Sequence, residues 1–209
     1  MTFKEAVNCY CCLLCKEHLD ELDDVKSLYM IYSSAPSPTS LHNLATACVV
    51  GDHQHRISSK SKTNAINVIK SRLPSILLTT FTDYEDLYNT IDHIIGSIPQ
   101  IGPLTIYDVS LRIGHLFIKP IYPQKILYLN SGAMEGAKKL LGGRKLSRKE
   151  VFNDFFSYPE AKAVVDINSL QSLPNNLVED FFCVMKDYLD LGQRGLIGDR
   201  DRTPIYLGM

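Results

Sequence analysis

The stretch that most constrains the fold is residues 98–105, a short apolar segment with two prolines and one glycine. Apolar residues recur at helical spacing on both sides of it, over residues 87–95 and 106–117. Gly96 is a natural terminator for the first helix, and Pro103 suits the first turn of the second, where its missing N–H costs nothing. The sequence therefore predicts two helices joined by a tight hairpin.

The ends of these helices carry further signals. Thr82, with Glu85 three residues later, has the pattern of a capping box, so the first helix is expected to begin there. Gly102 marks a bend at which we expect no side chain to be tolerated. The N–H groups of Gly102, Leu104 and Thr105 then point out of the second helix, and such a terminus attracts an anion, usually phosphate.

The whole chain has the length and patterning of a helical protein. Its 209 residues fit one globular domain, or two helical lobes, about 1–75 with the C-terminal helices and about 76–150 with the hairpin. We expect an all-α helical bundle with at most one very short β element, over residues 125–129. No apolar run reaches bilayer length, and six cysteines without a secretory signal favour the cytoplasm.

Outside the hairpin, helices are expected from about residue 25, over 41–50 and over 176–191. Ser147 with Glu150 has a second capping-box pattern and predicts a further helix start.

Four cysteines lie within residues 9–15, on an expected N-terminal helix. A zinc or iron–sulfur site is one interpretation, and cysteine used as a small buried apolar residue is the other. Cysteines on one short helix point in different directions, and no second cluster completes a tetrahedral site. We therefore predict no metal and no cofactor.

Two tracts of the chain are basic and contain no acidic residue. A surface of this kind is often only solvated, but its natural partner is a phosphate backbone that is bound without regard to sequence. The tracts comprise Arg56, Lys60, Lys62, Lys70 and Arg72 in the first, and Lys138, Lys139, Arg144, Lys145, Arg148 and Lys149 in the second.

The hairpin resembles the helix–hairpin–helix element of DNA-binding proteins. That turn reads Leu-Pro-Gly-hydrophobic-Gly, two variable residues and Thr-Ala. An ordinary helical hairpin with a Pro/Gly turn is the alternative. The matching residues are Ile98, Pro99, Ile101, Gly102 and Thr105, whereas Gln100 replaces the first glycine and Ile106 the alanine.

Over about residues 82–140, the order of elements is similar to that of the helix–hairpin–helix DNA glycosylase superfamily. The resemblance implies a helical fold, a duplex DNA partner and excision of a base. Bifunctional members carry a lysine where this chain has Leu104, so their lyase chemistry is not available. Members generally place a catalytic aspartate where this chain has Asn130, and an asparagine supplies no charge to stabilise an oxocarbenium-like sugar.

Asp108 is the candidate replacement for that carboxylate. Arg112 and His115 lie on the same helical face and could complete an acid–base group beside a flipped nucleotide. A surface Asp–Arg pair with a nearby histidine is the alternative. Tyr107 and Tyr128 lie where a base-stacking ring would be sought.

These observations leave three functional hypotheses. The first is a monofunctional glycosylase in which water attacks and Asp108 or Asn130 assists. The second is a DNA-binding module that keeps the scaffold without the chemistry, and the third is a helical interaction protein without nucleic acid. The DNA contacts expected under the first two are Gln100, Gly102, Leu104, Thr105, Arg112, Lys138, Lys139, Arg144 and Lys145.

Overall fold

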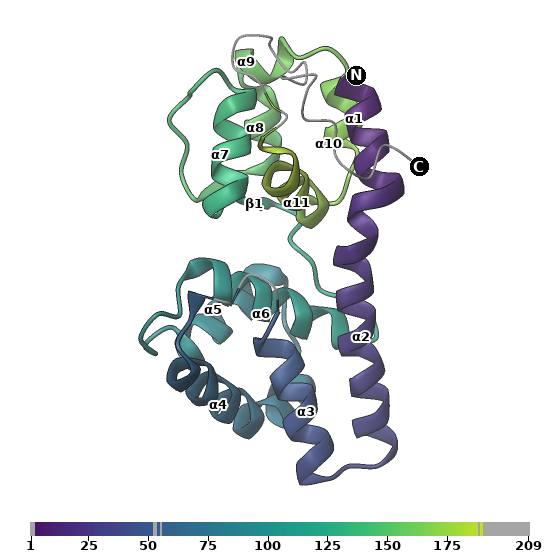
Figure 1. The fold of residues 1–209 in the computed structure, drawn as a ribbon, viewed down its shortest axis with the longest axis vertical. Helices are drawn as coiled ribbons and strands as arrows, with labels where there is room; N and C mark the ends of the chain where they lie inside the picture. The colour runs from purple at the N-terminus through teal and green to yellow at the C-terminus, as the bar shows by residue number, and fades with distance from the viewer. Residues whose placement is uncertain (1–2, 52–53, 55, 188, 190–209) are drawn as a thin grey trace. The chain divides into compact units, whose positions relative to one another are not determined.

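The computed structural model describes residues 3–51, 54, 56–187 and 189. These residues are mostly helical and include one two-stranded sheet, which confirms the expected all-α class with a short β element (Figure 1). The chain divides into two compact units, residues 20–122 and residues 1–19 with 123–209. Their boundaries differ from those of the lobes expected from the sequence, which lay near residues 75 and 150.

The unit of residues 20–122 contains the hairpin. It holds most of α2 (Cys15–Ser34), then α3 (Pro38–Val49), α4 (Ser59–Leu78), α5 (Tyr84–Ile95) and α6 (Pro103–Leu116) (Figure 1). α3 packs against α4 and α6, and α5 also packs against α4 and α6. α6 is buried along nearly its whole length, so polar side chains on it have to find partners inside the unit.

α2 is continuous through the acidic stretch that was expected to precede a helix start near residue 25. Leu22 and Val25 are buried, whereas Asp20, Asp23 and Asp24 are exposed. The acidic residues therefore form the solvent face of one helix, which explains why their accumulation does not mark a break. α3 begins earlier than expected because Ser37, the N-cap, and Ser40, in the first turn, form a capping box.

The N-cap of α5 lies one residue later than expected. Asp83, not Thr82, is the N-cap, and its carboxylate accepts a hydrogen bond from the Asp86 N–H at 3.1 Å. The Asp86 carboxylate in turn accepts from the Thr82 N–H at 3.2 Å. Two aspartates thus replace the expected Thr–Glu box, since aspartate is among the strongest N-caps. The Tyr84 hydroxyl donates to the Tyr107 carbonyl at 2.9 Å and joins α5 to α6.

The second unit combines the N-terminal and C-terminal parts of the chain. α1 (Phe3–Cys9) and a π-helical turn (Tyr10–Leu14) belong to it, with β1 (Ile126–Tyr128), α7 (Ser131–Leu140) and β2 (Lys149–Val151). Four short helices complete it: α8 (Phe152–Ser157), α9 (Pro159–Lys162), α10 (Ile167–Gln171) and α11 (Asn175–Met185). β1 and β2 pair antiparallel, with Leu127 opposite Glu150. The Tyr10 hydroxyl donates to Asp180 at 2.7 Å, which ties the N-terminal segment to α11.

Two expected helix boundaries are wrong in this unit. Glu150 does accept a hydrogen bond from the Ser147 N–H at 2.6 Å, but residues 149–151 form β2, and the next helix, α8, begins only at Phe152. The C-terminal helix is α11 and ends at Met185, so it is shorter than the expected span of residues 176–191. None of the helices in the described part of the chain combines the length and apolar character that crossing a bilayer requires.

Candidate functional site

The turn between α5 and α6 is held by Gln100. This residue has a positive φ of 67°, a conformation that glycine adopts most easily, and it occupies the position of the first glycine in the helix–hairpin–helix pattern. Its side-chain Oε1 accepts a hydrogen bond from the Ser58 N–H at 2.8 Å. The exposed turn is therefore anchored to the residue that caps α4.

The expectation that no side chain is tolerated at Gly102 is wrong. Its φ is −115°, which any residue can adopt, and a Cβ built there would have no atom within 4 Å. The unusual backbone conformation belongs to Gln100 instead. Gly102 is the N-cap of α6 and provides no side chain to accept from the helix, so the N–H groups of Leu104 and Thr105 have no partner within α6.

The N-cap of α4 is therefore hydrogen-bonded to the turn that leads into α6. Ser58 is the N-cap of α4 and is bonded directly to Gln100, two residues before the N-cap of α6. Each of these two N-caps lies at the positive end of its own helix dipole. Lys60 is exposed and Lys62 is partly exposed on the first turns of α4, which adds formal positive charge.

Asp108 lies inside the unit and not on its surface. Its carboxylate accepts a hydrogen bond from Gln54 Nε2 at 2.6 Å, and the residue is 7% exposed. Gln54 Oε1 accepts from the Gly51 N–H at 2.8 Å. The carboxylate thus ties Gln54, which lies between α3 and α4, to the centre of α6.

Arg112, one turn further along α6, is 3% exposed. Its Nη2 forms an ion pair with Glu21 at 2.7 Å, and its Nη1 donates to the Cys48 carbonyl at 3.3 Å. Burial raises the pKa of the Cys48 thiol to about 12, although the Arg112 guanidinium lowers it somewhat. Arg112 therefore joins α6 to α2 and α3, and this position leaves its charge facing the protein.

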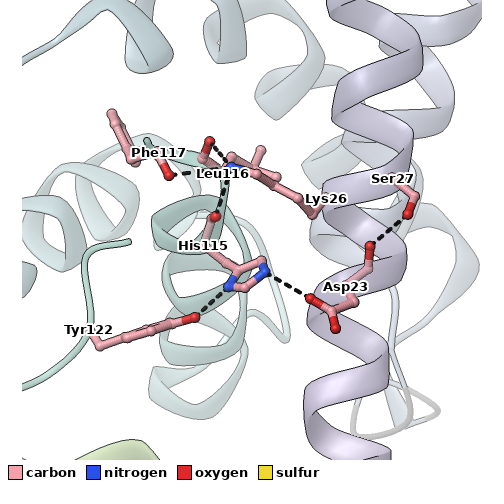
Figure 2. Close-up of polar contacts among 7 residues, drawn as sticks. All are labelled: Asp23, Lys26, Ser27, His115, Leu116, Phe117 and Tyr122. Carbon is pink, nitrogen blue, oxygen red and sulfur yellow. Dashed lines mark hydrogen bonds and ion pairs between the residues drawn. The ribbon is translucent and has the colours of Figure 1, made fainter. Parts of the chain in front are cut away.

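Asp108, Arg112 and His115 form a polar stripe along α6, and His115 lies at its C-terminal end (Figure 2). Its Nδ1 is hydrogen-bonded to the Tyr122 hydroxyl, and its Nε2 lies 3.5 Å from Asp23. Burial, and secondarily the charge of Asp23, raises the pKa of Tyr122.

The Lys26 side chain caps the C-terminal end of α6 (Figure 2). Its ammonium donates to the carbonyl of Leu116 at 2.7 Å and to those of His115 and Phe117 at 3.3 Å. Partial burial lowers the pKa of Lys26. The cation satisfies carbonyl groups that the helix end leaves without intrahelical partners.

Asn130 and the second basic tract belong to the other unit. Asn130 is buried, its carbonyl accepts from the Met134 N–H at 2.8 Å, and its Nδ2 has no hydrogen-bond partner among the described residues. Lys138 and Lys145 are exposed to solvent.

The other two basic candidates of this tract are engaged with acidic side chains. Lys139 lies 3.3 Å from Glu135. Arg144 lies 2.9 Å from Glu160, and its guanidinium stacks over the Tyr158 ring. Both cations retain partial exposure while bonded within the protein.

The two tyrosines considered for base stacking, Tyr107 and Tyr128, are both buried, so neither presents a ring face to solvent. Sequence reasoning did not identify the partners that organise the site, Gln54 and Ser58 among them. Each is bonded to a residue far along the chain, 54 positions away for Gln54 and 42 for Ser58, and no local pattern marks such a contact.

No group of three or more His, Cys, Asp and Glu side chains in the described part of the chain is placed to hold a metal ion. Comparisons of the sequence and structure with protein-family models, curated proteins and solved structures found no match.

Proposed function

We propose that residues 20–122 bind the phosphate backbone of duplex DNA through the α5–α6 hairpin, without regard to base sequence. The observation that carries this proposal is the hydrogen bond between the Ser58 N–H and Gln100, because it joins the N-cap of α4 to the turn that leads into α6. Backbone N–H groups at helix starts bind phosphate oxygens, and the dipoles of both helices favour negative charge there.

The charges around the hairpin support the same partner. Lys60 and Lys62 lie on the first turns of α4, in a tract that contains no acidic residue between Asp52 and Asp83. The chain as a whole has a formal charge of −1, so these lysines are a local concentration of positive charge and not a reflection of the total. Local positive potential is what governs non-specific binding to nucleic acid.

A catalytic role is not part of the proposal. Asp108 accepts from Gln54 inside the unit, and Arg112 is engaged with Glu21, so these groups face protein partners. Asn130 belongs to the other unit and is a neutral group. The function supported best is therefore a DNA-binding module, the second of the three hypotheses drawn from the sequence.

Substitution of Gly102 tests the proposal directly. A Cβ meets open space there, and aspartate is a favourable N-cap, so Gly102→Asp should keep or slightly raise the free energy of unfolding. Its carboxylate would occupy the N–H groups of α6 and repel phosphate. We expect its affinity for a short labelled duplex, measured by fluorescence anisotropy, to fall by about tenfold or more, equivalent to about 1.4 kcal/mol.

Gly102→Asn is the matched control, because asparagine caps the helix without adding charge. It should lose much less affinity than Gly102→Asp, and both variants should unfold at urea concentrations no lower than the wild type. Unchanged DNA binding by a folded Gly102→Asp variant would remove the hairpin from the binding surface.

A further inference from the structure

A groove lies between α4 and α5 and is not used by the hairpin or by the polar stripe of α6. Its volume is about 650 Å³, and both of its walls belong to the unit of residues 20–122. Pockets that bind small molecules generally have volumes of about 300–1,000 Å³. The groove therefore has room for one compact organic molecule.

The lining holds one formal positive charge, on Arg72, one formal negative charge, on Asp86, and the imidazole of His93. Arg72 contributes to the α4 wall and His93 to the α5 wall, and both are exposed. Among the residues that the structure describes, none forms an ion pair with Arg72. The one carboxylate in the lining, that of Asp86, accepts from the N–H and hydroxyl of Thr82 at 3.2 and 3.4 Å. Arg72 is thus the exposed cation of the lining, and an arginine fork binds an anionic group in a bidentate manner, whereas the partly buried Asp86 is engaged at the start of α5.

The rest of the lining is divided between apolar and polar side chains. Ile76 is buried, and Val68 and Ile94 are partly buried, so these three offer an apolar surface from both helices. Asn89 and Thr90 provide hydrogen-bonding groups on α5. An apolar surface with a few convergent polar groups is the usual character of a small-molecule site.

We propose that this groove binds a small organic anion, with an apolar body against Val68, Ile76 and Ile94 and an acidic group against Arg72. The acidic group is a carboxylate, sulfonate or phosphate, all of which accept from a guanidinium in the same way. The proposal is independent of DNA binding, because it involves neither the hairpin turn nor the first turns of α4.

The test compares two naphthalene probes, 2-naphthoate with a charged carboxylate and 2-naphthalenemethanol with a neutral hydroxymethyl group, by isothermal titration calorimetry and by NMR shifts of the protein of residues 1–209. We expect saturable binding of 2-naphthoate, with shifted amides on α4 and α5 and an affinity about tenfold above that of the alcohol. Absence of binding by 2-naphthoate, or equal affinities of the two probes, would overturn the proposal.

Variants locate the site. Arg72→Gln should weaken 2-naphthoate binding by about tenfold and leave the alcohol unchanged, whereas Arg148→Gln, at an exposed arginine of the other unit, should have no effect. Thr90→Trp should fill the groove and abolish binding of both probes. Equal effects of the two arginine variants would show that the anion binds elsewhere. Shifts confined to the hairpin would show that the probe occupies the phosphate site instead.

Discussion

Replacement of Arg112 by methionine distinguishes two roles of this residue. The sequence predicted a contact with DNA, whereas the structure shows a buried ion pair with Glu21. Methionine keeps most of the packing of the arginine stem and removes the guanidinium. The change eliminates the 2.7 Å ion pair with Glu21 and the 3.3 Å hydrogen bond to the Cys48 carbonyl.

The magnitude follows from the burial of each partner. Removing one member of a buried ion pair costs about 3–5 kcal/mol when the other charge is left without compensation. The Glu21 side chain is 37% exposed and regains hydration, which reduces the loss for Arg112→Met to about 2 kcal/mol. The Arg112 side chain is only 4% exposed, so Glu21→Leu strands the less accessible charge and should cost more, about 3–4 kcal/mol.

Urea unfolding followed by circular dichroism measures these losses, and the double variant completes the cycle. Its destabilisation should be clearly smaller than the sum of the two single losses, because the buried charges are removed together. DNA affinity of folded Arg112→Met should stay close to that of the wild type. A loss of stability below about 0.5 kcal/mol together with a large loss of DNA affinity would refute the structural role.

The remaining predictions concern stability and thiol chemistry. Gly114→Ala should lower the free energy of unfolding in urea by about 1–2 kcal/mol, because its Cβ would lie 2.3 Å from the Ile121 carbonyl oxygen. Helix propensity alone predicts a gain in stability, and a measured gain would contradict this contact. Burial raises the pKa of Cys48 from 9.0 to about 12, so its contribution to stability is complete below about pH 9 and is lost as the pH rises towards 12. Cys48→Ala should lack that part of the alkaline decline in urea titrations, and an identical decline would argue against a buried thiol. The exposed Cys12 should react with iodoacetamide in the native protein long before Cys48, as mass spectrometry of labelled peptides can show; simultaneous labelling would contradict the fold.

The hairpin was predictable because its signals are local. Pro103 begins α6 and Gly96 follows the last residue of α5, as their positions in the sequence indicated. The apolar periodicity predicted α-helices on both sides of the turn, and the short extended run expected over residues 125–129 contains β1. Each of these features depends on residues only a few positions apart.

The polar stripe of α6 was not predictable in the same way. Asp108, Arg112 and His115 have the spacing of a surface pattern, yet α6 is covered by other helices and the partners come from distant segments. Glu21, for example, lies 91 positions from Arg112 in the sequence. Long-range pairing of this kind depends on how helices pack, which periodicity within one helix does not specify.

The turn between α5 and α6 was predictable in part. The replacement of a pattern glycine by Gln100 was visible in the sequence, whereas its consequence was not. In the structure, the Gln100 side chain bonds to Ser58, a contact that a glycine cannot make. The departure from the pattern therefore adds an anchor between the turn and α4, and this anchor supports the proposed phosphate site.

The salt dependence of binding to duplex DNA tests the central proposal most directly. Contact of the hairpin and the first turns of α4 with about three phosphates predicts that the logarithm of the affinity falls linearly with the logarithm of salt concentration, with a slope of about −3. Binding should be similar for duplexes of unrelated sequence. Absence of binding at low salt, or binding that does not change across the salt series, would contradict a phosphate-binding hairpin.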